Sequence, residues 1–379
     1  MTVQTTINCP LEYSLRLFGV WPETSHPILK TIVWTIIMLT FLVFQCWYCI
    51  THITSSLVDL LDGFCITLSN SLLFLKLIII WLHHRTFRDI LTGVFEDCNK
   101  YDATIEDKRL MADKAMLSSR ISNVLIVYYA MTFLAYSGFA LVFFHEDVDT
   151  SVPKERKLLI RMEFPFDATI TPLYEIILVL QFIFESLMAY GAATSLILHV
   201  GSQIDLFCTK LTEVSCNYER KELPKLVLKD IVINHQRIIR LSKNIENIFT
   251  YISLYQFLSN MLVICFSSFI LVIVSKLNVP AEIIIKCFPY YLGVNCEAFI
   301  LCYTGEYLAS KSEGISESVY SFLWYELESQ DARDILLVIL RSQTQLILTA
   351  GKFVTLSLEA FANMLKASAS YVSVLYAMY

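Results

Sequence analysis

Charged residues are scarce in this sequence, and the basic ones are not gathered in any one segment. Asp, Glu, Lys and Arg make up 17% of the 379 residues, hydrophobic residues make up 56%, and the formal net charge is -6. A surface that binds nucleic acid would need clustered Lys and Arg, so no nucleic-acid partner is expected. A chain of this composition is typical of proteins that contact membrane lipid.

Motifs of metal binding, catalysis and secretion are also absent. The eleven cysteines are scattered, and the single Cys-x-x-Cys, Cys46 and Cys49, has no second Cys or His pair at ligand spacing. No His-Glu-x-x-His or Gly-x-Ser-x-Gly motif lies in an apolar run, and no signal peptide precedes the first of these runs. We therefore expect no metal, no cofactor and no enzymatic activity.

What the sequence does contain is a series of long apolar runs. A helix needs about 20 apolar residues to cross the hydrocarbon core of a bilayer, and seven runs reach that length. The sequence therefore predicts an all-α membrane protein with seven transmembrane helices. The runs cover residues 31–58, 57–81, 121–144, 171–204, 247–275, 280–307 and 344–379.

The basic residues between these runs predict an orientation. The connections on the side of the N-terminus contain 20 Lys and Arg residues, and those on the opposite side contain 5. Because cytoplasmic loops carry the excess of basic residues, we expect a cytoplasmic N-terminus and an extracellular C-terminus. The predicted regions are a cytoplasmic segment (1–30), helices one to six with their extensions (31–343) and a terminal helix (344–379).

Apolar residues at helical spacing continue through the polar stretch before the fifth run. This stripe predicts a layer of cytosolic helices, an anchor layer, that is continuous with transmembrane helices four and five. Its members are Val227, Ile231, Ile238, Leu241, Ile245 and Ile248.

The terminal run is two-faced when it is projected as a helix. A charged residue at bilayer depth costs about 2.5–3.5 kcal/mol on insertion scales, so its polar face should meet protein or water rather than lipid. This face either packs against neighbouring helices or lines a pore closed by copies from several subunits. It contains Lys352, Glu359, Asn363, Lys366, Ser370, Ser373 and Ala377, opposite Val354, Phe361, Leu365, Val372, Leu375 and Tyr379.

Aromatic residues and small hydroxyls are concentrated in the outer halves of helices two, three, four and six. Pro289 removes one backbone hydrogen bond and can open the sixth helix there. Apolar walls with a few hydroxyls suit a small lipophilic ligand, although such aromatic residues also serve as core or lipid contacts. The candidate ligand-binding residues are Phe64, Thr67, Phe133, Tyr136, Phe139, Tyr174, Phe182, Tyr290 and Tyr291, with Tyr136 and Tyr290 as the leading hydroxyl contacts.

Residues 319–379 contain a series of short motifs in a characteristic order. They are Trp324, Arg341 to Gln343, Leu348 to Phe353, Leu356 to Phe361, and Ser370 with Tyr371. With these motifs the segment resembles one known family, the insect odorant receptors. The N-terminal stretch NCPLEYSLRLFGVWP also looks like the opening of that family.

The resemblance implies a tuning subunit of an odorant-gated, nonselective cation channel in the plasma membrane of a sensory neuron. Such subunits form heterotetramers with an odorant receptor coreceptor, bind small volatile odorants in their outer halves, and line the central pore with their seventh helices. Carried onto this chain, the hydrophobic gate falls on Val374 and Met378, with Ser370 and Tyr371 just below it. A gate of this kind works by dewetting and needs no charge. Many relatives carry a basic residue near the end of this helix, where this chain has Tyr376.

Three other classes of membrane protein fit the sequence less well. G-protein-coupled receptors have the opposite orientation, and their Asp-Arg-Tyr and Asn-Pro-x-x-Tyr motifs are absent at the expected places. The related gustatory receptors usually end in Thr-Tyr and then Gln-Phe, a pattern also absent here, and they are the nearest alternative. A secondary transporter would use Lys286 and Glu297 as an ion relay, but the chain lacks the internal repeat of many transporters.

Overall fold

The computed structural model describes five continuous stretches of this helical protein. They are residues 26–53, 57–98, 225–276, 281–322 and 324–378. It also describes isolated positions between 16 and 21, 116 and 131, and 162 and 177. The third and fourth predicted apolar runs fall almost entirely outside the described residues.

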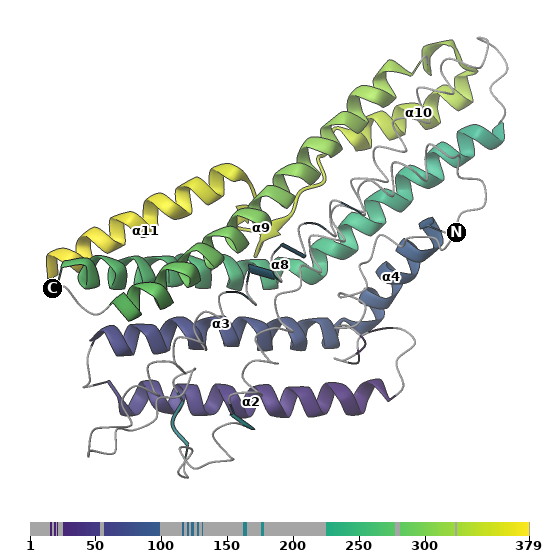
Figure 1. The fold of residues 1–379 in the computed structure, drawn as a ribbon. Helices are drawn as coiled ribbons and strands as arrows, with labels where there is room; N and C mark the ends of the chain where they lie inside the picture. The colour runs from purple at the N-terminus through teal and green to yellow at the C-terminus, as the bar shows by residue number, and fades with distance from the viewer. Residues whose placement is uncertain are drawn as a thin grey trace, which may run out of the picture.

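Two antiparallel helices begin the described part. Helix α2 covers Pro27–Thr51 and α3 covers Leu57–Leu82, and they lie side by side in Figure 1. Proline is favoured in the first turn of a helix because its missing N–H would have no partner there, which explains why α2 begins at Pro27. The two helices confirm the first two predicted apolar runs. The shorter α4, His84–Cys98, follows α3 and turns away from it.

Two very long helices form the centre of the fold. Helix α8 covers Lys225–Lys276 and α9 covers Ala281–Ser321. At 1.5 Å per residue they are about 78 and 62 Å long, whereas a hydrocarbon core is about 30 Å thick. The predicted fifth and sixth runs are therefore only the C-terminal part of α8 and the N-terminal part of α9, and both helices extend beyond them.

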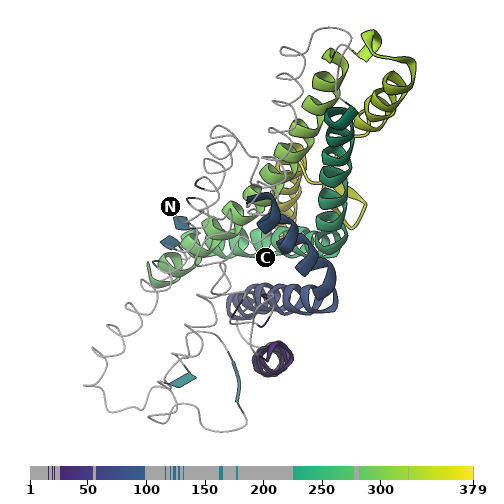
Figure 2. The ribbon, with the colours of Figure 1, turned by 90° about the vertical axis from the view of Figure 1, so that its right-hand side faces the viewer.

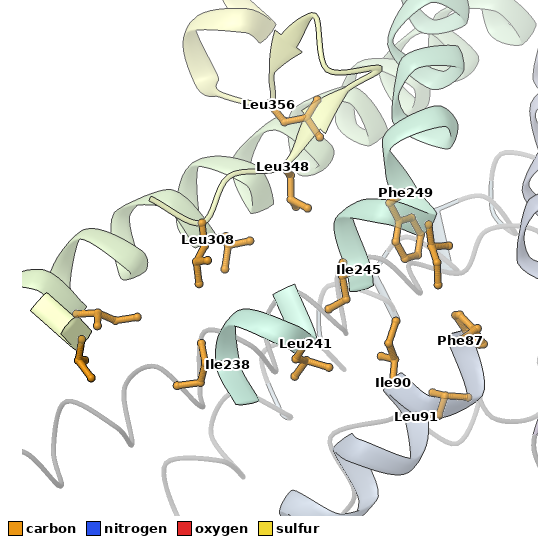
Figure 3. Packing of buried hydrophobic residues seen from close by; sticks show 14 of the residues in the cluster. Phe87, Ile90, Leu91, Ile238, Leu241, Ile245, Phe249, Leu308, Leu348 and Leu356 are labelled. Atoms are coloured by element: carbon orange, nitrogen blue, oxygen red, sulfur yellow. The ribbon is translucent and has the colours of Figure 1, made fainter. Parts of the chain in front are cut away.

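The predicted stripe before the fifth run lies on α8 and is buried except for Val227, which is partly buried. Ile245 and Ile248 are 1% and 0% exposed, and they form one hydrophobic cluster with side chains from α4, α9 and the segment before the terminal helix (Figure 3). We call this group the α4–α8 cluster. Its labelled members are Phe87, Ile90, Leu91, Ile238, Leu241, Ile245, Phe249, Leu308, Leu348 and Leu356.

The far end of α9 carries a short helical return. A 3-10 turn at Trp324–Glu326 leads into α10, Ser329–Ser342, which lies beside the end of α9 in Figure 2. Ile335, Val338 and Ile339 on α10 are buried in the α4–α8 cluster. This end of the fold is therefore held by a continuous aliphatic core.

The sequence predicted one terminal helix from residue 344 onward, and the structure differs from this prediction. Residues Thr349–Ala350 (β1) and Val354–Thr355 (β2) form an antiparallel hairpin, and helix α11 covers only Leu358–Met378. Gly351 and Lys352 both have positive φ, 63° and 64°, as the two central residues of a type I′ turn require. The helical projection was therefore wrong for Lys352 and Val354, which lie in the hairpin.

Two glycines let the hairpin fit between the long helices. A Cβ on Gly351 would lie 2.6 Å from Leu254 of α8, and one on Gly305 of α9 would lie 2.4 Å from the carbonyl oxygen of Leu356. The Gly351 N–H also donates to the Thr250 carbonyl of α8 at 2.9 Å. The hairpin is thus wedged between α8 and α9, directly before α11.

Among the described helices, three are long and apolar enough to cross a membrane. They comprise Pro27–Thr51, Leu60–Leu82 and Val227–Val274. The predicted sixth and seventh helices, α9 and α11, are less apolar because they carry residues such as Glu297 and Lys366. Glu297 contacts side chains of two other helices, whereas Lys366 is exposed.

Candidate functional site: the α3–α9 seam and the terminal helix

Helices α3 and α9 run in the same direction and are joined by two polar contacts. The Tyr290 hydroxyl of α9 is 2.7 Å from the Ser69 hydroxyl of α3 and donates to the Cys65 carbonyl at 3.1 Å. Seven residues further along both helices, the Lys76 ammonium lies 3.3 Å from a Glu297 carboxylate oxygen. A seven-residue interval returns each helix to nearly the same face, so both contacts lie on one seam.

The ion pair is completed by a third helix. Gln256 of α8 donates from its amide nitrogen to the same Glu297 oxygen at 2.7 Å. The Lys76 and Glu297 side chains keep 28% and 33% exposure, while Gln256 is 6% exposed. A carboxylate with two donors is far less costly to hold among apolar helices than an unpaired one. Glu297 therefore ties α3, α8 and α9 together at one level.

The four described candidate ligand residues do not share one wall. Tyr290 faces α3 across the seam, and both Tyr290 and Tyr291 pack against a small cluster that includes Val263 and Met364. Thr67 instead lies 3.7 Å from the Cys49 sulfur of α2, and Phe64 is 40% exposed. The other five candidates, Phe133, Tyr136, Phe139, Tyr174 and Phe182, lie outside the described residues.

Pro289 does not interrupt α9. The helix continues through this residue from Ala281 to Ser321, although proline cannot donate the usual backbone hydrogen bond. Its carbonyl also accepts a hydrogen bond from the hydroxyl of Tyr128, a residue of the predicted third run. The expected opening of the helix at Pro289 is therefore not observed. Lys286, the suggested relay partner of Glu297, has a side chain outside the described part.

The first turn of α11 is fixed by polar groups. The Ser357 hydroxyl accepts from the Ala360 N–H at 3.1 Å, in the manner of an N-cap. A Glu306 carboxylate oxygen of α9 accepts from the Leu358 N–H at 3.4 Å. Negative charge at a helix N-terminus is stabilised by the helix dipole. The base of α11 is therefore attached both to the hairpin and to α9.

One face of α11 packs against α8 and α9. Ala360, Met364 and Ser368 are buried at four-residue spacing, and the Ser368 hydroxyl lies 3.3 Å from the Met261 carbonyl of α8, to which it donates. The Phe361 ring meets Phe299 of α9 edge-on at 5.6 Å between centroids.

The outer end of α11 also has a contact with α8. The Lys276 ammonium lies 4.1 Å from the centre of the Tyr376 ring, within the range of a cation–π contact. Many relatives carry a basic residue where this chain has Tyr376. Here the positive charge beside that position comes from Lys276 of α8.

The outer end of α11 has large exposed side chains. Tyr371, Val374 and Met378 are 53%, 55% and 82% exposed, and Ser370 is exposed as well. The remaining helical members of the predicted polar face, Glu359, Asn363, Lys366, Ser373 and Ala377, are all exposed. Within this single chain the predicted gate residues and the helical members of the predicted polar face are therefore all exposed.

The fold and the comparisons together define a class of membrane receptor. A family model described as 7tm Odorant receptor matches residues 56–369. The chain therefore belongs to the odorant receptor family, a seven-transmembrane family whose curated members include insect receptors.

Three individual relatives share at most 30% of their residues with this chain over the matched regions. Odorant receptor 13a of Drosophila melanogaster is 26% identical over 96% of this chain and 94% of that receptor. Odorant receptor 85b of the same species is 30% identical, but over 40% of this chain and 38% of that receptor. The insect olfactory receptor OR5 of Machilis hrabei has a similar structure, with a TM-score of 0.78, 15% identity and 96% of each chain covered. A structure of that receptor in complex with eugenol gives the same TM-score.

Sequence reasoning missed three parts of the site. Ser69 and Lys76 are seven residues apart, as are Tyr290 and Glu297. The sequence alone does not show that the two helices are parallel neighbours, so it could not match Ser69 with Tyr290 or Lys76 with Glu297. Glu306 was not considered as a partner of the terminal helix. The hairpin was hidden because its apolar and β-branched residues continue the apolar run.

Proposed function

We propose that this odorant receptor is a subunit of a ligand-gated, nonselective cation channel whose pore is lined by α11. The observation that carries the proposal is the unequal packing of this helix. Ala360, Met364 and Ser368 attach it to its own chain, while Val374 and Met378 remain exposed. A membrane helix that leaves both polar and apolar side chains exposed suits a water-filled pathway shared between subunits.

The gate is placed at Val374 and Met378, with Ser370 and Tyr371 below it. Apolar side chains that close around a narrow axis expel water and stop ion flow without any charge. The polar residues nearer the base of α11 would then face the water-filled part of the pathway.

The ligand is a small volatile molecule that binds between α3, α9 and the predicted third and fourth helices. The machilid receptor OR5, which shares the fold, has been solved with eugenol, and this supports a ligand of similar size. Tyr290 supplies a hydroxyl on the seam, and Tyr136 is the second candidate. A ligand that binds the open state more tightly than the closed one shifts the population toward opening.

The assembly is a heterotetramer with the odorant receptor coreceptor in the plasma membrane. The N-terminus is cytoplasmic and the C-terminus extracellular, as the distribution of basic residues indicates. The α4–α8 cluster then lies on the cytoplasmic side and forms the anchor layer. The length of α8 and α9 beyond a bilayer supports this placement.

Whole-cell voltage clamp tests the proposal directly. Cells expressing this chain with and without the coreceptor are exposed to a panel of volatile compounds while GTP-dependent signalling is blocked. We expect a rapid cation current only when both subunits are present. A surface-expressed receptor that gives no current with volatiles but responds to sugars or bitter compounds would support a gustatory type of channel instead.

A further inference from the structure

The two contacts of the α3–α9 seam differ in chemistry. The Ser69–Tyr290 contact joins two neutral hydroxyls, which a ligand hydroxyl or carbonyl can replace at little cost. The Lys76–Glu297 contact joins opposite charges, and neither charge can leave its partner among apolar helices without a large penalty. One contact is thus exchangeable and the other is fixed.

The fixed contact lies between the candidate ligand region and the terminal helix. Along α9, Glu297 comes about 10 Å after Tyr290 and about 3 Å before Phe299, at 1.5 Å per residue. Phe299 is the residue whose ring meets Phe361 on α11. A movement of α9 that starts near Tyr290 must therefore pass the Lys76–Glu297 contact before it reaches α11.

The third partner restricts how α9 can move at this level. Glu297 receives hydrogen bonds from Lys76 on α3 and from Gln256 on α8. One carboxylate oxygen of α9 is thus attached to both α3 and α8. Rotation of α9 about its own axis would pull that oxygen away from both donors.

We propose that Lys76, Glu297 and Gln256 form a positioning site that couples the ligand region to the terminal helix. The three residues hold α9 in the register that keeps Phe299 against Phe361, so that a change at Tyr290 is transmitted to α11. They are positioning residues, because they act by holding α9 in place and not by contacting the ligand or the ion pathway. The proposal rests on the channel function proposed above.

Charge exchange provides the test. The variants Lys76→Met, Glu297→Gln and the double exchange Lys76→Glu/Glu297→Lys are expressed with the coreceptor and matched for surface level. We expect each single variant to lose at least tenfold in maximal agonist current. The double exchange restores an ion pair across the same two positions, and we expect it to recover the current to within threefold of wild type.

Glu317→Gln is the matched control. Glu317 lies on the same helix and is exposed, so removal of its charge should leave the agonist current within twofold of wild type. Single variants at Lys76 and Glu297 that behave like this control would overturn the proposal. A double exchange that reaches the surface but stays as inactive as the single variants would overturn it as well.

A second measurement separates this proposal from the channel function. The melting temperature of the full chain in detergent does not depend on any current, and it should fall in both single variants and recover in the double exchange. If wild type gives no current with any ligand, the channel proposal fails while the melting temperatures still test the ion pair. If the melting temperature recovers in the double exchange but the current does not, the pair is structural and the coupling role is wrong.

Discussion

The α4–α8 cluster and the α3–α9 seam are stabilised by opposite means. The cluster consists of branched aliphatic and aromatic side chains such as Ile245, Ile248 and Phe87, each at most 1% exposed. The seam is joined by hydroxyls and an ion pair whose members keep about a third of their exposure. Apolar packing resists any displacement, whereas a hydroxyl pair can exchange partners. This difference is the basis of our proposal that the cluster holds the helices while the seam responds to a ligand.

The largest effect is expected where the cluster meets the hairpin. In Gly305→Val, the new side chain would collide with the Leu356 backbone, since even a Cβ would lie 2.4 Å from its carbonyl oxygen. Overpacking of this kind costs about 1–3 kcal/mol or more. We expect a clearly lower melting temperature in detergent and reduced surface expression.

Gly314→Ala on the same helix is the matched control for this change. A Cβ at Gly314 meets no atom within 4 Å, and alanine favours the helix by about 1 kcal/mol. Its melting temperature should be equal to wild type or higher. Equal losses in both variants would show that α9 glycines matter for some reason other than the hairpin.

An intermediate effect is expected on the seam. Tyr290→Phe removes one hydroxyl that contacts Ser69 and Cys65, and a neutral hydrogen bond contributes about 0.5–1.5 kcal/mol. We expect the half-maximal concentration of an oxygen-containing agonist to change by roughly two- to tenfold, since that energy corresponds to such ratios. Dose–response recordings measure it.

The corresponding change at Thr67 separates the two sides of α3. Thr67 contacts Cys49 of α2 rather than α9, so Thr67→Val should leave the response to the same agonist nearly unchanged. A larger shift for Thr67→Val than for Tyr290→Phe would place the ligand on the α2 side of α3 and remove the seam from the binding site.

The smallest effect on stability is expected at an exposed position near the outer end of α11. Val374→Ser alters a side chain that is 55% exposed within the chain, and we expect the melting temperature of the isolated subunit to change little. A polar residue at a dewetting gate favours water in the constriction, so current without agonist should rise in the assembled channel. Unchanged basal current, with normal surface expression, would move the gate away from Val374.

Sequence reasoning was most successful where one physical rule decides the structure. The first two apolar runs became α2 and α3 because apolar length alone determines a membrane helix. The stripe from Ile231 to Ile248 was buried because its spacing leaves one face apolar along α8. In both cases the information lies within a single segment.

The rest depends on contacts between distant segments. The hairpin turn at Gly351 and Lys352 is stabilised by its fit against Leu254 and Thr250, which lie about a hundred positions earlier. The pairing of Lys76 with Glu297 likewise depends on which helices are neighbours. Glu297 could be recognised from sequence as an unusual intramembrane charge, but its partner could not.

The hairpin also offers a practical place to observe α11. Phe353 is 85% exposed and follows the turn directly, while Gly351 before it contacts α8 and Leu356 after it contacts α9. An environment-sensitive fluorophore attached at this position would sit at the base of the terminal helix without replacing any buried side chain. Its emission would turn a rearrangement of that helix into an optical signal, recorded in parallel with the current.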